Sequence, residues 1–89
     1  MKIKFSKKFR KQYDKLEAKI RAVFEKRLQM FMNDPFDPLL NNHQLIGTLK
    51  SFRSINITGD WRALYSEYTL RKERIIVFET IGTHSQLYR

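Results

Sequence analysis

Two histidines, His43 and His84, stand out in this sequence as side chains suited to proton transfer. A pair of imidazoles can act as general base and general acid near neutral pH, one accepting a proton and the other donating one. Arg62 would stabilise charge on a phosphate oxygen, and Trp61 and Tyr88 offer flat surfaces on which an unpaired base can stack. Together these types predict metal-independent RNA cleavage, in which a ribose 2′-hydroxyl attacks the adjacent phosphate.

Each of these residues also has an ordinary structural interpretation. A single histidine is more often a surface or capping residue, Trp61 and Tyr88 suit a hydrophobic core equally well, and Arg62 suits the exposed side of a strand. The two histidines and the scattered carboxylates lack the spacing of metal ligands, so we expect neither a metal nor another cofactor.

Length and composition predict one small domain over residues 1–89. Its 42% hydrophobic content is enough for one modest core. The absence of cysteine excludes disulfides and thiolate–metal sites, which fits a reducing cytoplasm. No apolar run approaches the roughly 20 residues that a membrane span needs, so we expect a cytoplasmic protein without a membrane partner.

The positive charge is concentrated at the N-terminal end. The chain has a net charge of +9; residues 1–33 contain eleven Lys or Arg against three Asp or Glu, and the remaining residues seven against six. A solvated helix face is one explanation. Such asymmetry also favours a polyanionic partner, either a nucleic acid or an acidic protein segment.

The first part of the chain predicts a strand and two helices. Residues 1–5 alternate polar and apolar side chains, and Ser6 is suited to cap a helix. Apolar residues then recur at helical spacing up to Phe31. Because about 27 residues is long for one globular helix, we expect a break at residues 17–19 and two antiparallel helices. The second should end before Pro35, since proline disfavours helix at the preceding residue.

The second part predicts three strands. After a long connection at residues 34–48, a β-hairpin is expected from the β-prone runs 52–57 and 61–65, whose strands extend over 49–57 and 61–68 around a Thr58-Gly59-Asp60 turn. A charged turn at 69–73 leads to a strand at 74–81 that is buried on both faces and ends at Gly82. The expected fold is α+β, with an N-terminal strand and a helical hairpin packed on a four-stranded, mainly antiparallel sheet (β-α-α-β-β-β) and a short C-terminal tail. The two helices should cover one face of the sheet and leave the opposite face for a functional site.

Four segments together resemble a known family of proteins: residues 42–47 (NHQLIG), 52–54 (FRS), 59–65 (GDWRALY) and 82–88 (GTHSQLY). They are similar in order and spacing to the RelE/ParE toxin superfamily, closest to the YafQ branch of type II toxin–antitoxin mRNA interferases. The resemblance implies a RelE-like strand–helix–helix–three-strand fold. It also implies a ribosome-dependent endoribonuclease that cleaves messenger RNA in the ribosomal A site, inhibits translation and is neutralised by an antitoxin.

The resemblance also implies roles for individual residues. His84 matches the general acid that protonates the leaving 5′-oxygen, and His43 matches the candidate base. The complete sets of candidates are, for catalysis, His84, His43, Arg62, Asp60 and Tyr88, and, for substrate binding, Trp61, Asn56, Arg53 and Lys50. In this set Arg62 matches a phosphate-contacting arginine, Asp60 and Trp61 an Asp-Trp pair at the hairpin turn, and Tyr88 a terminal aromatic that orients the nucleotide. The chain departs from the YafQ pattern at two positions: Asn56 stands in place of a histidine and Thr80 in place of an arginine.

The same resemblance implies binding partners for the basic residues of the predicted helices. Lys7, Lys8, Arg10 and Lys11 are expected to contact the backbone of ribosomal RNA or to attract an acidic antitoxin segment. Two other functions stay open at this point. One is a ParE-like inhibitor of DNA gyrase, which needs no acid–base pair, and the other is a module that binds antitoxin or RNA without cleaving.

Overall fold

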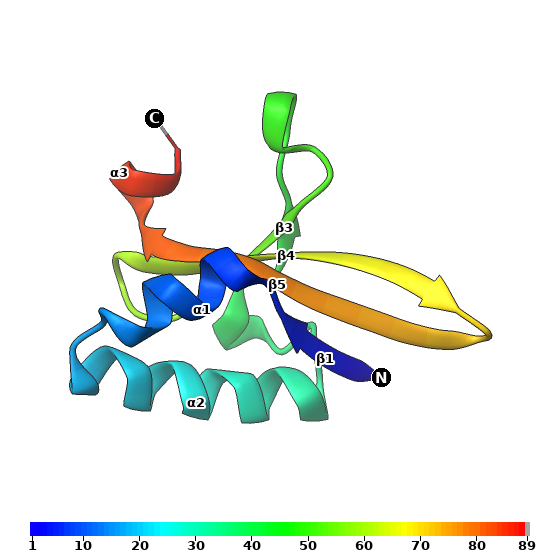
Figure 1. Cartoon of the computed structure of the whole chain (residues 1–89), viewed down its shortest axis with the longest axis horizontal. Coiled ribbons are helices and arrows are strands. Elements are labelled where there is room, and N and C mark those ends of the chain that lie inside the picture. The colour runs from blue at the N-terminus through cyan, green and yellow to red at the C-terminus, as the bar shows by residue number, and fades with distance from the viewer. Residues whose placement is uncertain (89) are drawn as a thin grey trace.

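The structure, a computed structural model, describes residues 1–88 and arranges five strands in one sheet in the order β1-β5-β4-β3-β2 (Figure 1). Short 3₁₀ helices are labelled η. The elements follow one another as β1 (Lys2–Phe5), α1 (Lys7–Asp14), α2 (Ala18–Asn33), η1 (Pro38–Leu40), β2 (His43–Gln44), η2 (Gly47–Leu49), β3 (Arg53–Asn56), β4 (Trp61–Leu70), β5 (Glu73–Thr83) and α3 (His84–Leu87).

The predicted meander and the joining of the first strand to the same sheet are both confirmed. Strands β3, β4 and β5 pair antiparallel, and β1 pairs parallel with β5. The prediction of four strands was one short, because β2 adds a fifth at the edge, where His43 is opposite Ser54. A strand of two residues contains no alternation of polar and apolar side chains, so its pattern could not be detected.

The helical hairpin is also confirmed, with its break slightly earlier than expected. Ser6 caps α1 by accepting a hydrogen bond from the Phe9 amide at 3.0 Å. Helix α1 ends at Asp14 and α2 begins at Ala18, although no glycine or proline separates them. The Arg21 guanidinium donates to the carbonyl of Leu16, so a side chain of α2 satisfies the backbone of the connection. Helix α2 ends at Asn33, as predicted from Pro35.

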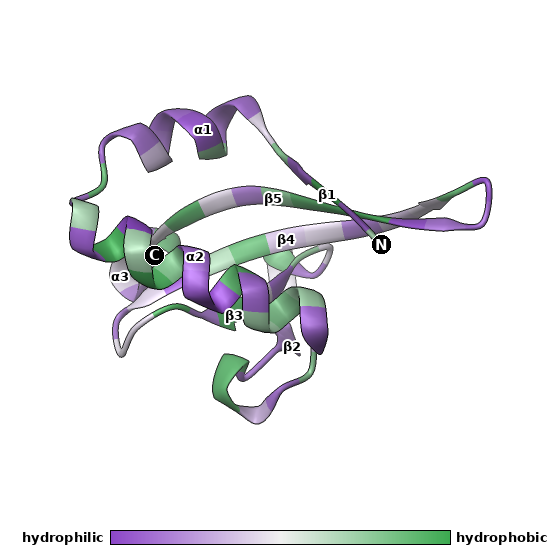
Figure 2. Cartoon of the chain, turned by 90° about the horizontal axis from the view of Figure 1, so that it is seen from below, coloured by the Kyte–Doolittle hydropathy of each residue, from purple (hydrophilic) through white to green (hydrophobic). Residues whose placement is uncertain are grey.

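An aromatic core fills the space between the sheet and the helices. Phe9, Phe24, Phe31, Tyr65 and Phe78 are all at most 2% exposed, and their rings pack edge-on or tilted at centroid distances between 5.1 and 6.0 Å. Hydrophilic residues predominate along α1, as the colouring of Figure 2 shows. No helix within residues 1–88 is both long and apolar enough to cross a membrane.

Three predicted boundaries were wrong. The strand expected from residue 49 begins at Arg53, because residues 47–49 form η2. The charged turn at 69–73 is shorter than predicted: only Arg71 and Lys72 lie between β4 and β5, both at positive φ. Gly82 does not end β5 but lies inside it, opposite Arg62, and Thr83 instead caps α3.

Candidate active site

The strand register places a row of side chains from four strands on the sheet face opposite the aromatic core. His43, Ser54, Leu64 and Thr80 are successive partners across β2, β3, β4 and β5. Directly paired residues project to the same face of a sheet. In Figure 1, α3 and the segment that contains η2 stand on the side of the sheet away from α2. The row therefore lies on a face bordered by these two short helices.

Helix α3 is held at the end of β5 by a complete capping box. The Thr83 hydroxyl accepts from the Gln86 amide at 3.3 Å, and Oε1 of Gln86 accepts from the Thr83 amide at 2.8 Å. The amide of His84 donates to the Asp60 carbonyl at 2.9 Å. The backbone of His84 is thereby bonded to the turn of the β3–β4 hairpin, which brings two of the sequence-predicted residues together.

The C-terminal aromatic residue connects His84 to the row. The rings of His84 and Tyr88 meet edge to face with centroids 4.6 Å apart. The Tyr88 hydroxyl donates to Oγ of Ser54 at 2.8 Å, and Ser54 is fully buried opposite His43. His84, Tyr88, Ser54 and His43 thus follow one another from α3 to the edge strand.

His43 is exposed, and its position is fixed by its neighbours. Its Nδ1 atom lies 2.8 Å from the Asn41 carbonyl, and Asn41 has a left-handed backbone with φ 45°. The next side chain, Asn42, donates to the Tyr65 hydroxyl at 2.8 Å and the Pro35 carbonyl at 2.9 Å, and accepts from Nε of Arg53 at 2.8 Å. This network ties the long connection to β3 and β4. A bond from Nδ1 to the carbonyl would leave Nε2 of His43 free to accept a proton.

The Arg62 side chain mainly stabilises the turn between β3 and β4. Its guanidinium donates to the carbonyls of Thr58, Trp61 and Gly59 at 3.0, 3.0 and 3.2 Å. Its register partners Asn56 and Gly82 place it on the same face as the row. Asp60 in this turn is exposed. The charge of Arg62 is therefore fixed next to the backbone that anchors His84.

Three substrate-binding candidates are not part of the row that runs from His43 to Thr80. Arg53 is the register partner of Tyr65, on the core side of the sheet, and its guanidinium lies 5.3 Å from the centre of the Phe36 ring. Trp61 is half-buried and packs against the aromatic core. Lys50 is exposed at the end of η2, where its carbonyl accepts from Gln44.

The two positions that depart from the YafQ pattern are both on the site face. Asn56 lies opposite Arg62, and its Oδ1 atom is buried without a hydrogen-bond partner among the described residues. Thr80 is 9% exposed, and its hydroxyl is hydrogen-bonded to Gln12 of α1. Oε1 of Gln12 also accepts from the Ile81 amide at 2.9 Å. These bonds hold α1 against β5 at Thr80, the position at which the YafQ pattern has an arginine.

Two residues that complete this geometry, Ser54 and Gln12, were missed from the sequence. Ser54 gave one signal, since it belongs to the FRS motif at residues 52–54, but no role was assigned to it. Gln12 gave none, because a glutamine on a charged helix is normally solvated.

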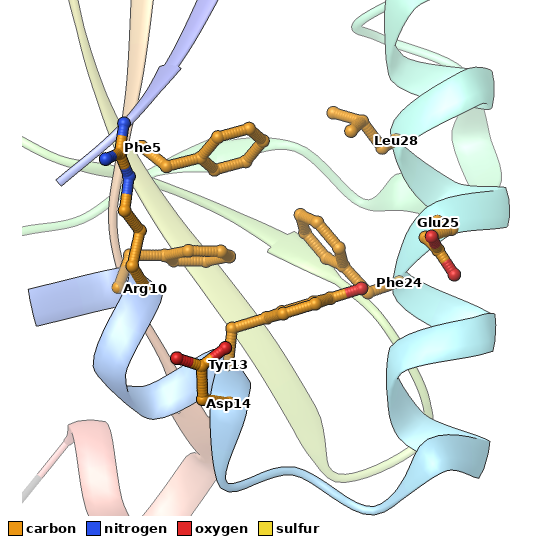
Figure 3. A pocket seen from close by; sticks show the side chains of 8 residues that line it. Phe5, Arg10, Tyr13, Asp14, Phe24, Glu25 and Leu28 are labelled. Atoms are coloured by element: carbon orange, nitrogen blue, oxygen red, sulfur yellow. The ribbon is translucent and has the colours of Figure 1, made fainter. Parts of the chain in front are cut away.

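A separate hollow of about 340 Å³ lies between α1 and α2 (Figure 3). Apolar side chains line its interior and charged side chains its rim: Phe5, Phe9, Tyr13, Phe24, Leu28, Arg10, Asp14 and Glu25. It shares no residue with the row that runs from His43 to Thr80. Among residues 1–88, no three His, Asp or Glu side chains gather in a way that could hold a metal ion.

The same fold occurs in solved toxin structures. YafQ from E. coli superimposes with a TM-score of 0.77 at 21% identity, covering 98% of this chain and 97% of that one. A YoeB/ParE toxin from Agrobacterium tumefaciens gives 0.76 at 18% identity, covering 94% and 99%. A chain of the E. coli DinJ–YafQ toxin–antitoxin complex gives 0.65 at 23% identity, covering 98% and 96%. The fold is therefore that of the RelE/YafQ-like toxins.

The family is defined by the sequence itself. The model of the YafQ family, described as the bacterial toxin of a type II toxin–antitoxin system, matches residues 1–89. The chain belongs to this family, which confirms the resemblance drawn from its four motifs. No curated protein sequence matches it.

Proposed function

We propose that this toxin is a ribosome-dependent endoribonuclease that cleaves messenger RNA and so inhibits translation in the cytoplasm. The observation that supports this most directly is the continuous connection between the two histidines: His84 against Tyr88, Tyr88 bonded to Ser54, and Ser54 opposite His43. An acid and a base on one face, separated by a buried polar residue, are the parts that phosphodiester cleavage by a 2′-hydroxyl requires.

The reaction balances with these two side chains alone. His43 takes the proton of the 2′-hydroxyl through its free nitrogen, and the oxygen attacks the adjacent phosphorus. The bond from phosphorus to the 5′-oxygen breaks, and His84 in its protonated form gives a proton to that oxygen. The products are a 2′,3′-cyclic phosphate and a free 5′-hydroxyl, and water later restores the protonation of both imidazoles.

The other site residues orient the substrate and the acid. Tyr88 holds its ring against His84 and presents an aromatic edge to the flanking base. Arg62 supplies positive charge beside the Asp60 carbonyl that anchors His84. Asn56 lies opposite Arg62 on the site face; its amide cannot exchange a proton near neutral pH, so its role is to position the substrate only.

A cognate antitoxin is the second partner that we propose. The support is the family and the solved complex of E. coli DinJ with YafQ, a protein with the same fold. The excess positive charge of residues 1–33 would attract an acidic segment of such a protein, and it would equally favour ribosomal RNA.

Primer extension tests the proposal. The protein is incubated with purified ribosomes and a defined message, and the new 5′ ends are mapped for wild type, His84→Ala, His43→Ala and the double variant. Ser85→Ala and Thr48→Ala are matched controls, because each is an exposed polar residue close to one histidine in the sequence. We expect cuts with wild type and both controls, and a loss of 10²-fold or more in rate for each histidine variant.

Two results would contradict the proposal. If wild type makes no cut, the proposed nuclease activity is ruled out. If the double variant cuts as wild type does, the proposed acid–base mechanism is ruled out. A parallel assay for gyrase-dependent DNA breaks separates the ParE-like alternative, since breaks without RNA cleavage would select it.

A further inference from the structure

Three hollows share lining residues with one another and are together called the trough, and Lys8 is the residue common to all of them. The first, about 480 Å³, is lined by Lys7, Lys8, Lys11, Gln12 and Lys15. The second, about 440 Å³, shares Lys8, Gln12 and Lys15 with it and adds residues that include Trp61, Thr80 and Leu87. The third, about 380 Å³, shares Lys8, Thr80, Gln86 and Leu87 with the second and continues to Leu49, Phe52 and Leu64.

The trough reaches the row of the candidate active site. Thr80 and Leu64 line it, and both belong to the row that continues through Ser54 to His43. Gln86 and Leu87 of α3 form one wall beside His84, while Leu49 of η2 and Phe52 form the other. A chain lying in the trough would therefore run from the lysines of α1 over Thr80 and Leu64, two residues of the row that contains His43, and beside Gln86 and Leu87 of the helix that begins with His84.

Helix α1 directs Lys8 into this trough by its periodicity. Lys8 and Gln12 are four residues apart and lie on the same side of the helix, away from the core residue Phe9. Gln12 is bonded to the Thr80 hydroxyl and the Ile81 amide, which fixes this side of α1 against β5. The exposed Lys8 thus lies one helical turn before Gln12, the residue that is bonded to Thr80.

The positive charge of the trough comes from α1. Lys8 and Lys15 are the cations that line its inner parts, whereas Arg62 donates to three carbonyls of its turn and Arg53 lies on the opposite face. Glu79 is the carboxylate in the same wall, and its Oε2 accepts from Ser66. The one ion pair within residues 1–88 joins Arg74 to Glu67, so Lys8 is not neutralised by a carboxylate there.

We infer that Lys8 is a substrate-binding residue whose ammonium contacts a phosphate of the RNA backbone beside Thr80. The inference rests on the proposed function, because RNA is the polyanion that must reach the two histidines. The inference applies to Lys8 and not to the neighbouring basic residues. Lys7 and Lys11 line only the first of the three hollows, and Arg10 is at the rim of the aromatic hollow on another side of α1 (Figure 3). An ammonium on a flexible stem binds phosphate as a point charge and does not select the base.

A binding experiment without ribosomes tests this contact. The full chain is titrated into a fluorescent single-stranded RNA that carries 2′-O-methyl groups to prevent cleavage, over a series of salt concentrations. We expect Lys8→Ala to weaken binding about fivefold at low salt and to reduce the slope of log K against log salt by about 0.7, the contribution of one phosphate contact. Lys8→Arg should keep the slope. Lys26→Ala on α2, an exposed lysine that lines none of these hollows, is the control and should change neither value.

The outcomes distinguish this inference from the nuclease proposal. If Lys8→Ala and Lys26→Ala behave alike in RNA binding, Lys8 is outside the substrate path even when wild type cuts messenger RNA. If wild type makes no cut but RNA binding depends on Lys8, the contact stands and the nuclease proposal fails. The same proteins are also titrated into polyglutamate as an acidic probe. If Lys8→Ala loses binding to polyglutamate while its binding to RNA is unchanged, the inference is overturned in favour of an acidic protein partner.

Discussion

The hydroxyl of Tyr88 donates a 2.8 Å hydrogen bond to Oγ of Ser54, and this bond joins the C-terminal end of the described chain to the interior of the sheet. Ser54 has no exposed surface, and its register partner on the edge strand is His43. The Tyr88 ring in turn packs against His84 at 4.6 Å. The position of His84 therefore depends on a strand 30 residues earlier, as well as on the helix that begins with it.

Removal of either partner of this bond should lower both stability and cleavage. Tyr88→Phe leaves the buried Ser54 hydroxyl without its donor, which we expect to cost about 1 kcal/mol of unfolding free energy, and Ser54→Ala should cost a similar amount. Because the two groups act through one bond, the double variant should be little worse than either single variant. Urea unfolding and primer extension on all four proteins measure this coupling, and additive losses would show that the bond does not position the tail.

Gly82→Ala should displace α3 while leaving the sheet folded. A Cβ atom at Gly82 would lie 2.9 Å from Oε1 of Gln86 and 3.3 Å from Cδ2 of Leu87. Since Oε1 of Gln86 accepts from the Thr83 amide, its displacement breaks the capping box of the helix that starts with His84. We expect cleavage to fall at least tenfold with a loss of stability of about 1 kcal/mol or less.

Hydrogen exchange of residues 84–88 checks this displacement directly, because these amides should exchange faster in the variant. Gly59→Ala is the matched control: its Cβ would meet nothing within 4 Å, and its φ is not in the left-handed region. Equal losses of activity in both variants would show that the close approach at Gly82 has no role in the site.

The elements of the fold were largely predictable because their signals are local. Ser6 before a helical period, Pro35 after one, and a Gly59 turn between two β-prone runs each reflect a backbone preference of a few neighbouring residues. The two-residue strand that contains His43 has no such signal, since its existence depends on pairing with β3.

The site was predictable only where its signals are local in the sequence. His43, His84 and Tyr88 were identified by chemical type and motif, whereas the face on which Arg53 lies depends on register, and the carbonyl bonds of Arg62 depend on the shape of its turn.

Asn42→Ala should loosen the connection that carries His43. The Asn42 side chain makes three hydrogen bonds, with the Tyr65 hydroxyl, the Pro35 carbonyl and Nε of Arg53. Their loss leaves partly buried polar groups unpaired, for which we expect about 2 kcal/mol of destabilisation, together with faster hydrogen exchange over residues 36–46 and slower RNA cleavage. Asn33→Ala, at the exposed end of α2, is the control and should change none of these values. Unchanged exchange in the Asn42 variant would contradict a role for this network in holding His43.

Alkaline pH should destabilise the protein through Tyr65. Burial raises the pKa of its hydroxyl above the ordinary value, although hydrogen bonds with Asn42 and Arg53 act in the opposite direction. The unfolded chain therefore releases this proton at a lower pH than the folded one, so the stabilisation is complete below a pH of about 10 and is lost as the pH rises further. Burial also raises the pKa of Tyr13, which adds to the same trend. Unfolding free energies from urea titrations between pH 7 and 11 should fall more steeply for wild type than for Tyr65→Phe, so that the gap between them narrows above pH 10. Tyr68→Phe, on the exposed part of β4, is the control, and parallel curves for wild type and Tyr65→Phe would remove Tyr65 as the source of the pH dependence.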